Sequence, residues 1–325
     1  MPDRGGALSR GAVVIGLDDI RAARWRIQPH IRKTPILPYG QLSAREDFGG
    51  TVTLKLELLQ AAGSFKARGA MNRLLTLSAE QLARGVVTAS GGNHGLAIAR
   101  SAHVLGAKAK IFLPSNVVAD KVAKLKRWGA EVEIVGAIWD DANAAALAYA
   151  KETGATYAHP FSDPVVVAGQ GTLGLDILDE IPDVDVILVA IGGGGLITGL
   201  STAVKALRPQ TRIIGIEPYG SPTLHACLEA GKLVTLDRLE TRVATMSCRR
   251  TDQTIFDAVA GNVDEIVLVS DDEMEQAARS LWFEFGIAAD LSGAAAVAAL
   301  QAKRVVPAPG SKVCALVCGA GTDGT

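Results

Sequence analysis

Three glycine-bearing loops, each between a strand-like and a helical segment, constrain the fold of this 325-residue chain most strongly. The first is GSFKARGA at residues 63–70, which follows the alternating apolar run 51–59 and opens a helical pattern. The second, SGGNHG at 90–95, follows a short apolar run. The third, GGGGL at 192–196, follows the uninterrupted apolar run 185–191. Such junctions are typical of strand–loop–helix units.

The remaining strand-like segments alternate with helical ones along most of the chain. They lie at residues 86–87, 109–113, 130–135, 212–217, 265–270 and 312–318. Strands that alternate with helices through short loops favour a parallel sheet that is covered on both faces. The pattern alone therefore predicts an α/β fold, without locating a domain boundary.

Composition excludes several classes of protein. The 33 lysines and arginines balance 34 acidic residues, which gives a net charge of −1 and no electrostatic case for nucleic acid or an anionic membrane. No apolar run approaches the roughly 20 residues that span a bilayer, and no signal-peptide pattern opens the chain. The four cysteines show neither metal-site spacing nor a disulfide framework. We therefore predict a cytoplasmic protein without membrane or nucleic-acid partners.

The glycine loops suggest anion binding, and the first one also carries a candidate nucleophile. Bare backbone N–H groups at a helix N-terminus favour an anion through unpaired donors and the helix dipole. The loops at 90–95 and 192–196 fit neither the dinucleotide fingerprint nor the phosphate loop that ends in Lys-Ser/Thr. Lys66 lies at a junction where desolvation would lower its pKa toward the nucleophilic amine. The alternative for Lys66 is an ordinary solvated surface lysine.

Taken together and in this order, the three motifs resemble those of the fold-type II pyridoxal-phosphate enzymes. The threonine/serine dehydratase and serine racemase family is the most similar group, and the resemblance extends from about Asp18 to the C-terminus. It implies a fold similar to tryptophan synthase β, with two three-layer α/β domains and mainly parallel sheets. Residues 1–55 and 159–325 would form the larger, cofactor-binding domain, and 56–158 a smaller inserted domain. It also implies a homodimer or larger assembly.

The resemblance also implies roles in binding pyridoxal 5′-phosphate. Lys66 would form the internal Schiff base and later remove the substrate α-proton. Phe65 would lie against the pyridine ring, although plain core packing predicts nearly the same position. The phosphate cradle would consist of Gly192, Gly193, Gly194, Gly195 and Leu196, because side chains would block the close approach of the backbone.

Other positions would contact the cofactor ring and the substrate. Asn93 would hydrogen-bond the phenolic oxygen of the cofactor. Cys318 stands where the family has a serine at the pyridine nitrogen; a thiol is a weaker partner, and packing as a small hydrophobe is the alternative. The substrate carboxylate would be bound by the loop of Ser90, Gly91, Gly92, Asn93 and His94.

Several departures from the family pattern bear on the reaction. Gly91 occupies the place of the serine that serves serine racemases on the face opposite the lysine, so elimination is favoured over racemisation. Glu217 is a weak metal candidate, because the acid that usually follows is missing and one carboxylate rarely holds a hard cation. Asp290 replaces a glutamate. Arg249 and Arg250 would either recognise a second substrate carboxylate or remain solvated.

The sequence therefore predicts a pyridoxal-phosphate-dependent lyase of amino-acid metabolism. It would eliminate the β-hydroxyl of serine or threonine, or of a hydroxyaspartate or β-aryl serine, and yield a 2-oxo acid and ammonia. Alternatives with the same fold are an amino-acid racemase and a β-replacement enzyme. An alternative of another class is a non-catalytic dinucleotide- or metabolite-binding α/β protein, in which Lys66 would have no covalent task.

Overall fold

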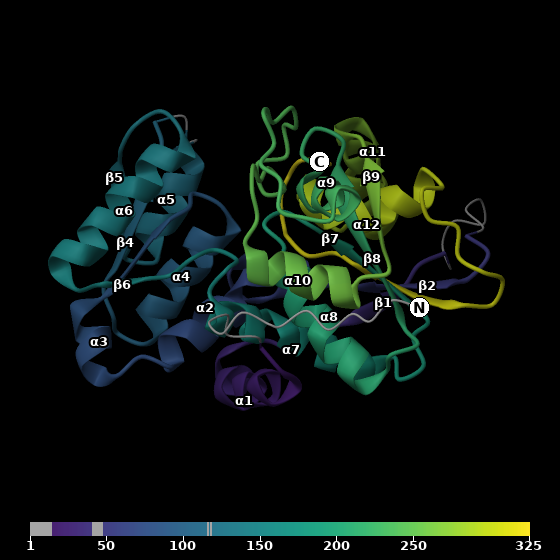
Figure 1. Cartoon of the computed structure of the whole chain (residues 1–325), viewed down its shortest axis with the longest axis horizontal. Coiled ribbons are helices and arrows are strands. Elements are labelled where there is room, and N and C mark those ends of the chain that lie inside the picture. The colour runs from purple at the N-terminus through teal and green to yellow at the C-terminus, as the bar shows by residue number, and fades with distance from the viewer. Residues whose placement is uncertain (1–14, 41–47, 116, 118) are drawn as a thin grey trace.

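The computed structural model describes residues 15–40, 48–115, 117 and 119–325, and in it the chain forms two sheets that lie side by side (Figure 1). The six-stranded sheet has the order β1-β2-β10-β7-β8-β9, and the four-stranded sheet has the order β5-β4-β3-β6. Every strand pair is parallel except β1 with β2. The predicted α/β class with mainly parallel sheets is thereby confirmed.

The strands are β1 Ile36–Pro38, β2 Thr51–Lys55, β3 Val86–Ala89, β4 Ala109–Leu113, β5 Glu131–Ile134, β6 Thr156–Tyr157, β7 Val186–Ala190, β8 Arg212–Pro218, β9 Glu265–Val269 and β10 Lys312–Leu316. The α-helices are α1 Leu17–Ile27, α2 Lys66–Leu75, α3 Ala79–Arg84, α4 Asn93–Val104, α5 Ala119–Arg127, α6 Trp139–Thr153, α7 Pro164–Glu180, α8 Gly195–Leu207, α9 Thr223–Ala230, α10 Gln253–Asn262, α11 Asp271–Phe285 and α12 Leu291–Gln301. Short 3-10 helices span Gln28–His30, Glu57–Leu59 and Ala61–Gly63.

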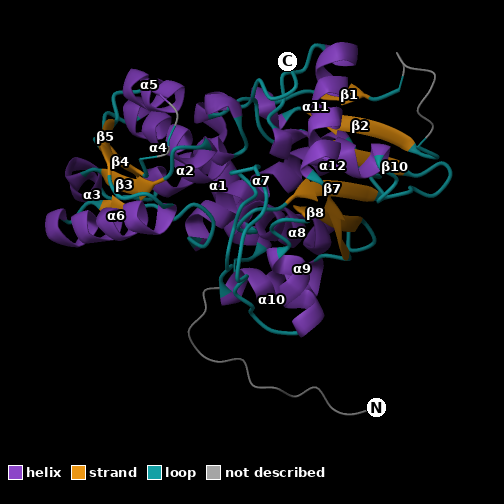
Figure 2. Ribbon diagram, turned by 90° about the horizontal axis from the view of Figure 1, so that it is seen from above, coloured by secondary structure: helices purple, strands orange, loops and turns teal. Residues whose placement is uncertain are grey.

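Helices cover the two faces of the larger sheet, and this explains its sequence pattern. All five residues of β7 are buried, as expected for a parallel strand that packs on both faces. Figure 1 shows strands of this sheet between α12 on one side and α7 and α8 on the other. Figure 2 gives the view from above, in which α12 lies over the strands. Within the described residues, no helix combines the length and the apolar character needed to cross a bilayer.

The two sheets fall on either side of the domain boundaries predicted from the sequence. The four-stranded sheet is built from strands between Val86 and Tyr157, and the six-stranded sheet from strands before residue 56 and after residue 185. We propose the same division, with residues 56–158 as the smaller domain. The α2 helix packs against both α7 and α4, so it lies between the two sheets.

Close glycine contacts join α7 to two helices that begin at the predicted site. A Cβ on Gly169 of α7 would lie 2.6 Å from the Cα of Gly69 in α2. A Cβ on Gly199 of α8 would lie 2.6 Å from the backbone nitrogen of Gly171 in α7. The backbones can approach this closely only because these residues lack side chains. The start of α2 and the start of α8 are therefore fixed relative to each other through α7.

Candidate active site

The predicted site residues line one cavity of about 960 Å³ where strands of both sheets end. The loop after β3 contributes residues from the smaller sheet, and the segments after β7 and β10 contribute residues from the larger one. The lining includes all the residues predicted for the cofactor and the substrate carboxylate: Phe65, Lys66, Ser90, Gly91, Gly92, Asn93, His94, Gly192, Gly193, Gly194, Gly195, Leu196 and Cys318. Ligands of parallel α/β sheets usually bind at the carboxyl ends of the strands.

Lys66 is the first residue of α2 and its amine lies in this cavity. The Nζ atom donates a hydrogen bond to the carbonyl oxygen of Pro160 at 2.7 Å. It lies 5.2 Å from the centroid of the Phe65 ring. In the described part of the chain, no carboxylate lies within ion-pair distance of this amine. Burial without a counter-charge lowers the pKa of Lys66 to about 8.

Backbone contacts with the segment after β10 fix the loop that precedes Lys66. The N–H of Phe65 donates to the Cys318 carbonyl at 3.1 Å, and the N–H of Ala320 donates to the Gly63 carbonyl at 2.8 Å. Gly63 has a φ of +82°, a conformation that glycine adopts at no steric cost. The end of β10 therefore positions Lys66, although the two segments are about 250 residues apart in the sequence.

The tetraglycine loop fits a phosphate group. Gly194 is the N-cap of α8 and has a φ of +93°. A Cβ on Gly193 would lie 2.1 Å from the ring of Phe161, so a side chain there would clash. Glycine therefore allows the close packing of this loop. Its backbone N–H groups lie at the start of α8, where the helix dipole favours an anion. The donor set and the absence of side chains match the phosphate of the cofactor that the resemblance implies.

Asn93 connects the two sheets at this site. It begins α4, and its Nδ2 donates to Oδ2 of Asp290 at 3.1 Å. Asp290 is the N-cap of α12, and its Oδ1 accepts from the N–H of Gly293 at 2.6 Å and the hydroxyl of Ser292 at 2.7 Å. Burial raises the pKa of Asp290, which these hydrogen bonds partly oppose. An amide nitrogen carries two hydrogens, so Asn93 retains one donor for a ligand.

His94 is buried and neutral. Its Nε2 lies 3.0 Å from the carbonyl oxygen of Ala158 and must donate to it. Nδ1 is then an acceptor, and it has no hydrogen-bond partner among the described residues. Burial, with a smaller effect from the charge of Lys66, lowers the pKa of His94 to about 3. In this arrangement the ring offers no N–H to a carboxylate. The donors that the Ser90–His94 loop offers are the backbone N–H groups in the first turn of α4.

Cys318 follows β10 and is both buried and part of the cavity lining. Its Sγ donates to the Ser292 carbonyl at 3.5 Å. Burial, followed by the charge of Asp290, raises the pKa of the thiol, so it stays protonated. Its contact with the pyridine nitrogen stays a prediction.

Glu217 lies in β8 and does not line the cavity. Its two carboxylate oxygens accept the backbone N–H groups of Leu224 and His225, both at 2.9 Å, at the start of α9. Burial raises the pKa of Glu217 to about 7. Among the described residues, no group of three or more His, Cys, Asp or Glu side chains is arranged to hold a metal ion.

The two adjacent arginines line the cavity, but protein groups engage them. Arg249 donates from Nε to the Leu236 carbonyl at 2.8 Å and from Nη2 to the Asp237 carbonyl at 3.2 Å. Arg250 donates from Nη1 to Oγ1 of Thr235 at 2.8 Å. Both side chains therefore hold the segment 235–237 in place.

Sequence reasoning missed several residues that line the site. Pro160 contributes a backbone carbonyl and Phe161 a ring beside the glycine loop, and Trp139 lines the cavity from the start of α6. A carbonyl leaves no trace in a sequence pattern. The run His159-Pro160-Phe161 directly after a short strand-like segment was the one local signal.

Comparison with known proteins agrees with the family resemblance found in the sequence. The model of the family described as pyridoxal-phosphate dependent enzyme matches residues 27–319. An L-threonine ammonia-lyase of Thermotoga maritima is 38% identical, over 95% of this chain and 76% of that protein. A phenylserine dehydratase of Ralstonia pickettii is 36% identical, over 94% and 93%. The structure of maize serine racemase has a TM-score of 0.90 at 32% identity, covering 95% of this chain and 94% of that one.

Proposed function

The chain belongs to the pyridoxal-phosphate-dependent enzyme family, and we propose that it is a β-eliminating ammonia-lyase. Its substrate would be a β-hydroxy-α-amino acid, and its products a 2-oxo acid and ammonia. The observation that carries the proposal is the unpaired amine of Lys66, which shares one cavity with the tetraglycine loop and the Ser90–His94 loop. Relatives named threonine ammonia-lyase and phenylserine dehydratase support elimination as the reaction.

We propose that Lys66 holds the cofactor covalently and that the Gly192–Gly195 loop with Leu196 binds its phosphate. Asn93, Phe65 and Cys318 would contact the ring. When bound, pyridoxal phosphate supplies an electron sink for the charge that develops at the substrate α-carbon.

Lys66 is also the proposed base for the α-proton. With a pKa of about 8, about a tenth of the amine is neutral at pH 7, against less than about one part in a thousand for an ordinary lysine. The carbonyl of Pro160 accepts a hydrogen bond from Nζ and so holds the amine inside the cavity. Backbone N–H groups at the start of α4 would bind the α-carboxylate and orient the substrate.

Racemisation is the second candidate, because the maize serine racemase shares the fold closely. It requires a proton donor on the face opposite Lys66, and Gly91 has no side chain to supply one. A Cβ on Gly91 would lie 3.1 Å from Cγ2 of Val117 and 3.2 Å from Cδ2 of Leu113. These contacts involve side-chain atoms that can shift slightly, so we expect Gly91→Ser to fold. Gain of racemisation in that variant would support our use of Gly91.

The test is an assay of 2-oxo acid and ammonia released by the holoprotein. Separate stereoisomers of serine, threonine, hydroxyaspartate and phenylserine are the substrates, and Lys66→Ala is the control. Oxo acid that disappears in Lys66→Ala supports the lyase, whereas interconversion of enantiomers without oxo acid contradicts it. A thiol added to the same assay would reveal β-replacement. Assembly as a homodimer or larger, measurable by sedimentation, and a cytoplasmic location stay predictions.

A further inference from the structure

Three large apolar side chains of the cavity lining have no assigned role in binding the cofactor or the α-carboxylate. Ile138 and Trp139 lie at the start of α6, and Leu239 lies in the segment after α9. These side chains are 56%, 40% and 37% exposed, respectively. Large apolar side chains that remain exposed in a concave site mark a surface that a ligand covers.

Trp139 is fixed in orientation beside the loop that would bind the substrate carboxylate. Its indole Nε1 donates to the carbonyl oxygen of Ala89 at 2.8 Å, and Ala89 directly precedes Ser90. The turn before Trp139 is fixed as well, because Oδ2 of Asp141 accepts the backbone N–H of Ile138 at 3.3 Å. A ring that is already held in place offers apolar contact area at little cost in conformational entropy.

Among the described residues, each arginine of the cavity lining donates to at least one protein group. Arg242 pairs with two carboxylates of α11, and Arg249 and Arg250 hold the segment 235–237. Bidentate recognition of a second carboxylate would therefore compete with the existing contacts of Arg242 and Arg249. Apart from Lys66, the remaining charges of the lining are one of each sign, on Lys121 and Asp140.

We propose that the substrate is a β-hydroxy-α-amino acid with an aryl or similarly large apolar group on its β-carbon. This rests on the proposed function and specifies its substrate class. The α-carboxylate would bind at Ser90–His94, and the β-substituent would lie against Trp139, Ile138 and Leu239. A cavity of about 960 Å³ is near the upper end of the range for small-molecule sites, so it has room for more than a hydroxymethyl group beside the cofactor.

The reaction on such a substrate balances. For 3-phenylserine, the Cα–H and Cβ–O bonds break, a Cα=Cβ bond forms, and the hydroxyl leaves with one proton as water. Hydrolysis of the resulting enamine consumes one water and releases ammonia. The net change converts 3-phenylserine into 2-oxo-3-phenylpropanoate and ammonia, without an oxidant or a reductant.

The first experiment compares kcat/KM of the holoenzyme for four substrates. These are serine and the threo and erythro isomers of 3-phenylserine, threonine and 3-hydroxyaspartate. Release of 2-oxo acid is the readout. We expect kcat/KM for one phenylserine isomer to exceed that for threonine by about 10-fold or more, in keeping with the contribution of aromatic contacts and apolar burial.

Variants at Trp139 then test whether this residue contacts the β-substituent of the substrate. Trp139→Ala should lower kcat/KM for phenylserine about 10-fold more than it lowers kcat/KM for threonine. Trp139→Phe, which keeps a ring but loses the indole N–H, should recover part of the preference. Trp25→Ala is the matched control, because Trp25 is 80% exposed on α1 and does not line the cavity, and it should change neither value.

The outcomes distinguish failure of the aryl assignment from failure of the proposed lyase function. Oxo acid from serine, threonine or hydroxyaspartate at equal or higher kcat/KM than from phenylserine would overturn the aryl assignment and leave the lyase intact. An equal loss on all substrates in Trp139→Ala would also overturn it, since the tryptophan would then only support the Ser90 loop. Absence of oxo acid from every amino acid would overturn the proposed function and the assignment together.

Discussion

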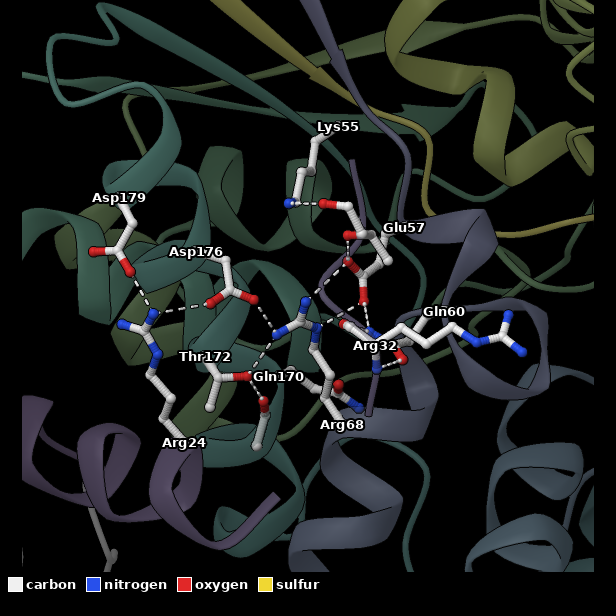
Figure 3. Close-up of polar contacts among 12 residues, drawn as sticks. Arg24, Arg32, Lys55, Glu57, Gln60, Arg68, Gln170, Thr172, Asp176 and Asp179 are labelled. Atoms are coloured by element: carbon white, nitrogen blue, oxygen red, sulfur yellow. Dashed lines mark hydrogen bonds and ion pairs between the residues drawn. The ribbon is translucent and has the colours of Figure 1, made fainter. Parts of the chain in front are cut away.

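Two cations on the first turn of α2 occupy opposite environments. Lys66 faces the cavity without a carboxylate partner, and burial lowers its pKa to about 8. Arg68 is fully buried, and its guanidinium contacts Glu57 at 2.7 and 3.1 Å, Asp176 at 2.7 Å and Thr172 at 3.1 Å (Figure 3). Burial alone would lower the pKa of Arg68, but the charges of Glu57 and Asp176 outweigh burial and raise it.

The difference shows how one helix can support chemistry on one side and rigidity on the other. The cluster around Arg68 joins α2 to the 3-10 helix Glu57–Leu59 through Glu57 and to α7 through Asp176. Asp176 also contacts Arg24 of α1. Nearby, Lys55 of β2 pairs with Glu180 at the end of α7 at 2.6 Å. These groups have exchanged water for fixed partners. Lys66, in contrast, is buried with a hydrogen bond to the Pro160 carbonyl and no carboxylate partner in the described part of the chain, so its amine can lose a proton and react.

The largest effect should come from removal of the unpaired cation. We expect Lys66→Ala to reduce 2-oxo acid release about 10³-fold or more, because it removes both the base and the covalent anchor. Its free energy of unfolding should equal or exceed that of the wild-type apoprotein, because a buried unpaired amine contributes no stability. Chemical denaturation of the two apoproteins measures this, and a large loss of stability would contradict the contrast with Arg68.

Removal of the paired cation should act mainly on stability. We expect Arg68→Met to lower the free energy of unfolding by about 3–5 kcal/mol, because Glu57 and Asp176 remain buried without a counter-charge. Urea denaturation measures the change. The double variant Arg68→Met/Glu57→Gln should recover part of the loss, and a single variant as stable as wild type would show that the cluster is dispensable.

The hydrogen bond between Asn93 and Asp290, which links the two sheets, should contribute to the affinity for the cofactor. Asp290→Asn removes the carboxylate that accepts the hydrogen bond from Asn93. We expect about 10-fold weaker binding of pyridoxal phosphate, because the Asn93 amide would no longer be held in one orientation. Equilibrium titration of the apoprotein with the cofactor measures this. The matched control is Asp18→Asn at the exposed start of α1, outside the cavity lining, which should leave the affinity unchanged.

The last expected effect is a pH dependence of apoprotein stability. The pKa of Lys66 is lower in the folded state than its ordinary value of 10.5, so the unfolded chain binds more protons between about pH 8 and 10.5. The destabilisation that the charged amine causes is fully present below about pH 8 and is relieved as the pH rises through this window. Across this pH range, the free energy of unfolding of the wild-type apoprotein should therefore rise relative to that of Lys66→Met. Urea denaturation at several pH values measures this, and the same pH dependence in both proteins would indicate an ordinary lysine.

Local patterns in the sequence determined much of this protein. The helix after each glycine loop and the position of Lys66 at a helix start could be predicted, because steric and hydrogen-bonding preferences of neighbouring residues decide them. The strand-like run 51–59 is a strand only in part: β2 ends at Lys55, and 3-10 helices span Glu57–Leu59 and Ala61–Gly63 before Lys66. The uninterrupted apolar run at 185–191 likewise gave the fully buried strand β7. The family resemblance added the assembly of the three loops into one site, which the cavity lining shows.

Only the tertiary structure decided the charge state and the partners of the site residues. The sequence predicted desolvation of Lys66 from its position at a strand–helix junction, but it did not predict which carboxylates would pair with Arg68. Arg68 is paired because Asp176, 108 positions away, comes within 2.7 Å, while the group nearest the amine of Lys66 is the carbonyl of Pro160. Desolvation and Coulomb interactions depend on distances in space between residues far apart in the chain, so a pKa follows from the fold and not from the local sequence.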